Sequence, residues 1–199
     1  MTSWKNNNTL ESRRLVEEVL DSPKKTRKVV ARDKDHLRQL IMNRIEKRGP
    51  DCDLNDIDVR RITDMSYLFY GLTSYFNGDI SQWDVSNVKN MRCMFDGSDF
   101  NGDISQWDVS NVRDMSQMFF NSKFDGDISS WDVRKVREFG HMFTDSPFSH
   151  DLSKWNTRSL RSADGAFAGT VLAKNPPKWN LSKWRVLQSA EDGYKRMGW

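Results

Sequence analysis

Cysteine, histidine and long apolar runs are all scarce in this chain of 199 residues. Its two cysteines, Cys52 and Cys93, are too few for a framework of disulfides. Its three histidines, His36, His141 and His150, do not fall in a cluster with metal-ligand spacing. No segment has the length of a membrane span or of a signal peptide's apolar core. We therefore expect a soluble cytoplasmic protein with free thiols.

Signatures of catalysis are equally scarce. The sequence has no glycine-rich loop of the kind that cradles phosphate and no nucleophile elbow. It also has no paired carboxylates on a pocket-forming scaffold, because its Asp and Glu residues recur at a fixed period. We expect no enzyme activity, no cofactor and no resident metal ion.

What the chain does have is a repeat of 24 residues. The segment FNGDISQWDVSNV, from Phe76 to Val88, returns nearly unchanged from Phe100 to Val112. It returns more loosely from Phe124 to Val136 and, eroded, from Phe148 to Leu160. A period of this length means that one unit cannot bury its apolar face alone and must stack on its neighbours.

Each unit reads as a strand followed by a short helix. The pattern I-x-x-W-x-V at 80–85 matches the strand of a leucine-rich repeat, with Trp in its middle position. The pattern V-x-x-M-x-x-M-F at 88–95 has the spacing of one helical stripe, and Ser86 stands where its N-cap belongs. These patterns predict an α/β fold, a short leucine-rich-repeat-like solenoid with one strand and one short helix per repeat.

The two ends of the chain differ from the repeats. A strand is predicted from Thr26 to Ala31, followed by a helix that begins after Asp33 and ends at Gly49. Further upstream, a capping-box pattern opens an amphipathic helix at 9–21. The expected organisation is an arm at 1–22, an N-terminal cap at 23–50, the solenoid at 51–171, and a degenerate last repeat with a C-terminal cap at 172–199.

These motifs resemble the BspA-like leucine-rich-repeat proteins and the related mycoplasma lipoprotein repeat family. The matching text is F-N-G-D-I-S-x-W-D-V-S-N-V followed by M-x-x-M-F, and the resemblance covers about residues 33–170. It implies a solenoid used for binding, usually at cell surfaces, and it carries no catalytic residues over. Because no export signal is visible, we favour an intracellular, viral or phage-borne relative over a surface adhesin.

A tryptophan recurs once in every repeat. Such a column could be a stacking platform for bases or sugars, but large apolar residues at a strict period belong first to the core. We therefore predict that the indoles point inward. The tryptophan column consists of Trp83, Trp107, Trp131, Trp155 and Trp179.

The outward positions of the predicted strands are the candidates for partner recognition. One Asp per repeat falls there, and neighbouring strands lie about 4.8 Å apart, so these carboxylates would form a repulsive ladder of like charges. Two interpretations stay open: they accept hydrogen bonds from local backbone, or a basic protein surface docks on them. We call Asp58, Asp84, Asp108 and Asp132 the acidic column. The whole predicted strand face comprises these four and Asp56, Gln82, Gln106, Ser130, Arg134, Lys154 and Arg158.

A second Asp column follows the Asn-Gly turn of each repeat. Calcium-binding β-roll repeats place oxygen ligands in a comparable turn. Here each turn has one Gly and one such Asp, so calcium binding is the less favoured alternative to a structural role. This turn column consists of Asp79, Asp103, Asp127 and Asp151.

Basic residues also recur once per repeat, at the starts of the predicted helices. Net charge is +6 over residues 1–50, −9 over 51–133 and +6 over 134–199. Nucleic-acid binding needs a continuous basic track, and acidic neighbours interrupt this one, so a solvated face is the interpretation we favour. We call Lys89, Arg113, Arg137 and Arg161 the basic row.

These features predict a non-enzymatic, protein-binding solenoid, an intracellular interaction or inhibitor module that recognises another protein through its strand face. A surface adhesin or lipoprotein-type repeat protein is the first alternative. Nucleic-acid binding through the basic ends is the second. No contact with a membrane is expected.

Overall fold

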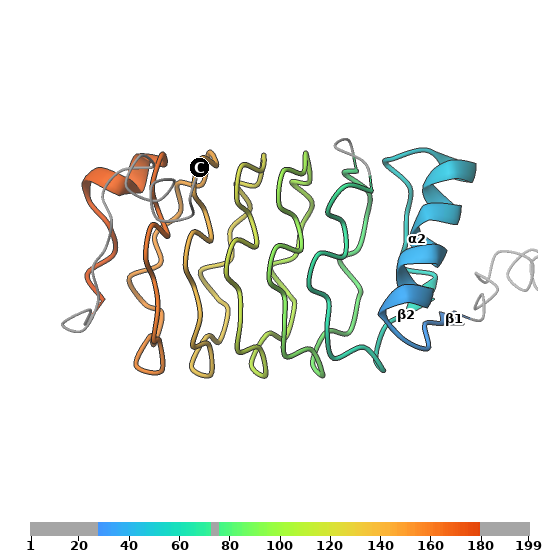
Figure 1. Cartoon of the computed structure of the whole chain (residues 1–199), viewed down its shortest axis with the longest axis horizontal. Coiled ribbons are helices and arrows are strands. Elements are labelled where there is room, and N and C mark those ends of the chain that lie inside the picture. The colour runs from blue at the N-terminus through green and yellow to red at the C-terminus, as the bar shows by residue number, and fades with distance from the viewer. Residues whose placement is uncertain (1–27, 73–75, 180–199) are drawn as a thin grey trace, which may run out of the picture.

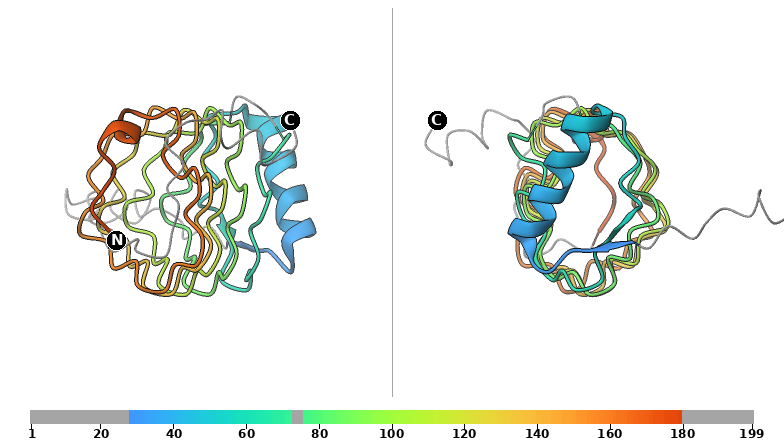
Figure 2. Two further views of the ribbon diagram at one scale, coloured as in Figure 1. Left: turned by 60° about the vertical axis from the view of Figure 1, so that its left-hand side comes forward. Right: turned by 90° about the vertical axis from the view of Figure 1, so that its right-hand side faces the viewer.

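The computed structural model describes residues 28–72 and 76–179. Over this part the chain winds into coils, one per repeat, that stack side by side along one axis (Figure 1). Seen along that axis, the coils superpose around a common interior, and helix α2 lies across the N-terminal end (Figure 2).

Two short strands begin the described part of the chain. β1 (Val29–Val30) pairs in parallel with β2 (Ile57–Asp58), so that Val29 lies opposite Ile57. β1 falls within the strand predicted from Thr26 to Ala31, whose first two residues lie outside the described part. The pairing fastens the chain ahead of α2 to the first coil.

Helix α2 (Lys34–Arg48) caps the N-terminal end of the stack. The Asp33 side chain accepts a hydrogen bond from a backbone N–H of the first helical turn at 2.8 Å, and Gly49, with φ 87°, follows the last turn. Both boundaries are those that the sequence predicts. Leu37 and Ile41 are fully buried, so the inner face of α2 closes the core.

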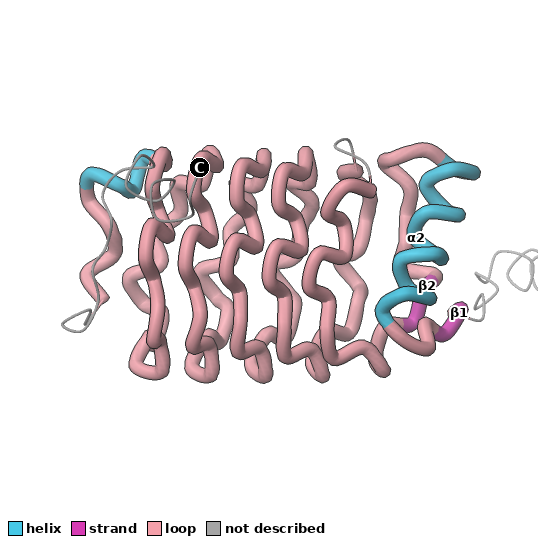
Figure 3. The backbone as a smooth tube through the Cα atoms, in the orientation of Figure 1, coloured by secondary structure: helices cyan, strands magenta, loops and turns pink. Residues whose placement is uncertain are grey.

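Residues 76–170 contain neither the predicted strands nor the predicted helices, whereas β2 lies on the predicted strand that carries Asp56 and Asp58. Residues 76–170 form turns and isolated bridges, and the next regular element is the 3-10 helix η1 (Val171–Lys174) (Figure 3). The helix predicted at 88–95 is wrong because Cys93 adopts the left-handed backbone region, with φ 53°. Gln117 and His141 do the same in the following coils. Because this helix does not form, Ser86 is not a helix N-cap.

A parallel backbone ladder takes the place of these helices. The N–H groups of Met91, Cys93 and Phe95 donate to carbonyls of the next coil at 2.9–3.0 Å. The N–H of Met94, which lies between two of these residues, instead bonds the carbonyl of Met91 in its own coil at 3.2 Å. Alternate donors thus join neighbouring coils and close local turns, so the backbone is satisfied without a helix.

Aromatic side chains fill the interior of the stack. The rings of Phe95, Phe119 and Phe143 lie one above another, with centroids 5.6 and 5.8 Å apart and nearly parallel planes. Phe124 stacks beside Phe119 at 3.9 Å and belongs to a second column of phenylalanines. Because each ring is covered by rings of the adjacent coils, a single repeat could not bury them alone.

The tryptophan column points inward, which confirms the prediction. Its exposed fractions run only from 3% at Trp83 to 8% at Trp179. The indole N–H of Trp83 donates to the Leu54 carbonyl of the preceding coil at 3.0 Å, and three other members make the equivalent bond. Trp155 is the exception, since its buried Nε1 has no hydrogen-bond partner among the described residues.

Some predictions concern residues at the margins of the described part. The arm at 1–22, with its amphipathic helix, and the C-terminal cap beyond residue 179 lie outside it. The predicted end of the solenoid, between residues 171 and 172, falls within η1.

Candidate functional site

The acidic column is held by the same local hydrogen bond in each coil. Oδ1 of Asp84 accepts the backbone N–H of Ser86 at 3.1 Å, and Oδ1 of Asp108 accepts that of Ser110 at 3.0 Å. Asp58 and Asp132 accept the N–H two residues later in the same way. Each carboxylate therefore stabilises its own turn, which is the local interpretation left open by the sequence.

Ion pairs divide the acidic column into neutralised ends and a charged centre. Asp58 and Asp132 each pair with the Arg two residues later, with a nitrogen–oxygen distance of 2.7 Å. Hydrogen bonds from these guanidinium groups hold the pKa of both carboxyls below its usual range. Asp84 and Asp108 are exposed and form no ion pair among the described residues. Within the acidic column, the carboxylates without an ion pair are thus those of two adjacent coils, and Asp84 also interacts at longer range with the Arg60 guanidinium.

The remaining strand-face residues fall into two groups. Gln82, Gln106, Ser130, Arg134, Lys154 and Arg158 are all exposed, as predicted. Asp56 is different, because it pairs with Arg44 and Arg48 of α2 at 3.0 and 3.4 Å. Asp56 therefore belongs to the contact between the cap and the first coil.

The turn column is committed to backbone hydrogen bonds. Each of its four carboxylates accepts the N–H of the Ser two residues later at 2.8 or 2.9 Å. This bond lowers the pKa of each carboxyl. Over residues 28–72 and 76–179, no group of three or more His, Cys, Asp or Glu side chains is placed to hold a metal ion.

The basic row follows one edge of the backbone ladder. The N–H of Arg113 donates to the Lys89 carbonyl at 2.9 Å, and Arg137 and Arg161 repeat this bond to the preceding member at 2.8 and 2.7 Å. All four side chains are exposed. None of the four forms an ion pair within the described part of the chain.

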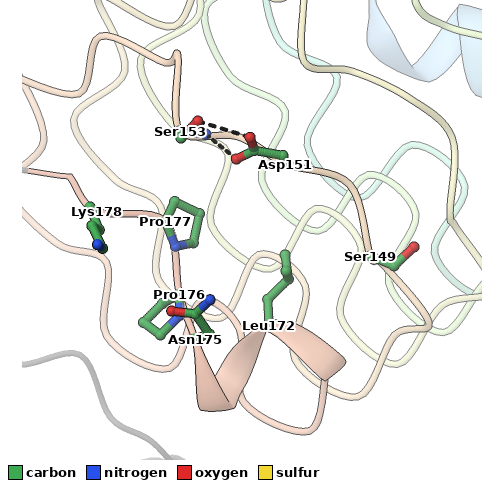
Figure 4. Close-up of a pocket in the computed structure, with 8 residues that line it drawn as sticks. All are labelled: Ser149, Asp151, Ser153, Leu172, Asn175, Pro176, Pro177 and Lys178. Carbon is green, nitrogen blue, oxygen red and sulfur yellow. Dashed lines mark hydrogen bonds between the residues drawn. The ribbon is translucent and has the colours of Figure 1, made fainter.

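A pocket of about 350 Å³ lies near the C-terminal end of the described residues, beside η1 (Figure 4). The carboxylate of Asp151 faces it but is engaged by the N–H and hydroxyl of Ser153 at 2.8 and 2.9 Å. Leu172, Pro176 and Pro177 form the apolar part of its wall. This pocket could not be predicted from the sequence, because its wall combines a repeat with the irregular segment after it.

Two ionisable groups on the ladder side were missed by sequence reasoning. Burial raises the pKa of Asp96 to about 6. Burial lowers the pKa of His141, whose ring lies against Gly165 and whose Nδ1 is 3.2 Å from Thr144 Oγ1. Asp96 follows the stripe that was read as a helix and His141 lies within the equivalent stripe two coils later, so the surroundings of both depend on the actual backbone.

The stack of register-matched coils defines the chain as a repeat protein. A model of the family described as "Mycoplasma protein of unknown function, DUF285" matches residues 41–146 and again 98–194. The chain belongs to this family. No curated protein and no solved structure matches the chain. Of the described residues, none form a helix long and apolar enough to cross a membrane.

Proposed function

We propose that this chain is a non-catalytic binding module, a solenoid related to the BspA-like leucine-rich-repeat proteins, that recognises another protein through its strand face inside a cell. The observation that carries the proposal is the pair of exposed carboxylates on adjacent coils, Asp84 and Asp108, which form no ion pair among the described residues. Neighbouring like charges are unfavourable in the free protein, and a basic partner would relieve them.

The strand face is suited to recognition because its backbone is already ordered. Each Asp of the acidic column fixes its own turn, and the Asn111 side-chain amide donates to the Ser86 carbonyl of the preceding coil at 2.8 Å. A partner that binds such a surface orders side chains but not main chain, which lowers the entropic cost of association.

Charge along this face also indicates the orientation of a partner. The centre is acidic at Asp84 and Asp108, whereas Lys154 and Arg158 make its C-terminal end basic. A partner with a basic patch beside an acidic one would match this order. An inhibitor that covers a basic functional surface is one such module, and a surface adhesin is the alternative role.

Neutralising the charged centre tests the proposal. In the double variant Asp84→Asn, Asp108→Asn, the amide oxygen can still accept the turn N–H, so only charge is removed. The matched control is Asp103→Asn, Asp127→Asn, which removes the same charge from exposed residues with the same turn bond in the turn column.

The readout is affinity purification from the native cells with quantitative mass spectrometry. Proteins captured by the parent chain should be depleted at least several-fold with the acidic-column variant and retained with the control. Capture of the same proteins by all three chains would refute recognition through this face. Cytosolic fractionation of the native protein separates the intracellular role from the adhesin role.

A further inference from the structure

The basic row is a line of like charges set by the backbone. Its four members occupy the same position in consecutive coils, and N–H to carbonyl bonds of 2.7–2.9 Å join them in sequence. Adjacent coils of a parallel ladder lie about 4.8 Å apart, so the row extends over about 14 Å. Four exposed cations at this spacing form a continuous positive edge.

Acidic neighbours do not neutralise this edge. Asp64 pairs with Lys34 of α2 at 2.9 Å, and Asp114 accepts the N–H of Ser116 at 2.8 Å. Neither these carboxylates nor Glu138 forms an ion pair with the row among the described residues. The acidic neighbours that the sequence led us to expect as interruptions of the basic row therefore form no ion pairs with it.

One further cation lies close to the row. The Lys135 ammonium donates to the Asn111 side-chain oxygen at 2.7 Å, a contact that joins two coils, and it forms no ion pair among the described residues, although it lowers the pKa of Asp132 at longer range. Lys135 precedes Arg137 by two residues. Positive charge near the row is thus reinforced at its centre.

We propose that the basic row binds the phosphate backbone of single-stranded nucleic acid without reading its sequence. Three of the four residues are Arg, whose planar fork matches a phosphate group. A single strand also offers charges of one sign at regular intervals, as the row does. In the described part the exposed large aromatic side chains are Tyr67 and Tyr70, both before the first member of the row. Bases therefore find no aromatic platform along the row, and stacking would not select among them.

The proposal predicts how strongly the affinity for an oligonucleotide depends on salt concentration. Binding to a single strand weakens with log salt at a slope of about −0.7 per phosphate neutralised, or about −2.8 for four contacts. Affinity of the parent chain for a labelled oligothymidylate should therefore fall about 50-fold between about 50 and 200 mM salt. The variant Arg113→Gln, Arg137→Gln keeps two contacts and should lose only about sevenfold.

Fluorescence anisotropy with labelled oligothymidylate is the measurement. The control Lys123→Gln, Lys174→Gln removes the same charge from exposed residues outside the row and should keep the parent slope. Circular dichroism of each variant checks that the stack is intact. Parent-like binding by Asp84→Asn, Asp108→Asn would show that the row acts independently of the strand face.

Three results would overturn the proposal. The first is no binding of the parent chain at low salt. The second is an equal loss of slope in the control, which would reduce the effect to net charge. The third is displacement of the oligonucleotide by polyglutamate as effectively as by unlabelled oligothymidylate at equal charge, which would assign the row to acidic polypeptides.

Discussion

Replacing Trp131 by Phe should destabilise the protein more than replacing Trp155 by Phe. Both indoles are almost fully buried, with exposed fractions of 4% and 6%. The Trp131 N–H donates to the Ile104 carbonyl at 3.1 Å, whereas the Trp155 N–H has no partner among the described residues. The two substitutions remove the same atoms, so they differ chiefly in the hydrogen bond.

The expected difference in the free energy of unfolding follows from what each substitution does to the indole hydrogen bond. Trp131→Phe loses a hydrogen bond of about 1 kcal/mol, although the Ile104 carbonyl keeps the bond that it accepts from the Trp107 backbone N–H at 3.1 Å. Trp155→Phe removes a buried donor that already lacks a partner, whose desolvation costs about 1–3 kcal/mol, so it relieves a penalty. The cost of the smaller ring is shared and largely cancels. We expect the free energy of unfolding to fall by about 2 kcal/mol more in Trp131→Phe than in Trp155→Phe.

Urea unfolding followed by far-ultraviolet circular dichroism measures this difference without relying on tryptophan emission. Trp179→Phe controls for position, because Trp179 lies one coil beyond Trp155 and donates to the Leu152 carbonyl at 2.9 Å. If fraying of the end dominated, Trp179→Phe would cost even less than Trp155→Phe. The hydrogen-bond explanation instead requires it to cost more. An equal or larger loss in Trp155→Phe than in Trp131→Phe would refute the reasoning.

Two further predictions concern packing and protonation. Gly78→Ala should lower the free energy of unfolding by about 1–3 kcal/mol, and more than Gly102→Ala, because its Cβ would collide with the Cys52 carbonyl oxygen rather than only with a phenylalanine ring; urea unfolding that ranked them the other way would contradict this. Burial raises the pKa of Asp96 to about 6 from an ordinary value of 3.8, so the folded state holds this proton more tightly and its contribution to stability is lost as pH rises from about 4 to 7. Asp96→Asn should therefore be more stable than the parent at pH 7 by about 1 kcal/mol, after allowance for partial exposure, and the advantage should shrink near pH 4; a constant difference at both pH values would disprove the assignment.

The sequence was sufficient to predict which residues of a repeat are buried and which are exposed, but not the backbone conformation that places them there. Met91, Met94 and Phe95 are fully buried, as a helical stripe would place them. Two overlapping turns, the first of which contains the left-handed Cys93, bury the same positions, so spacing alone does not distinguish the two backbones. Cys93 is not a residue type that favours φ 53°, and thus gave no warning.

The candidate site was predictable to a similar degree. Its columns follow from the period, and the exposure of Asp84 and Asp108 follows from their place beside an inward Trp. Neutralisation of Asp58 and Asp132 was missed, although each has an Arg two residues later, because a carboxylate and a guanidinium at that spacing meet only when the turn brings them together. The contact of Asp56 with Arg44 depends on how α2 docks.

The amino-acid sequence by itself determined the 24-residue period, the stacking of units and the membership of the buried columns, because burial depends on which positions are apolar and how often they recur. Tertiary structure decided the backbone path, since alternate N–H groups of each coil find acceptors only in the coil beside it. It also decided which charges remain unpaired, because an ion pair forms between side chains that the folded chain brings within reach. The unpaired charge of Asp84 and Asp108 and that of the basic row therefore depend on how the coils stack, although the residues themselves can be identified from the sequence of each repeat.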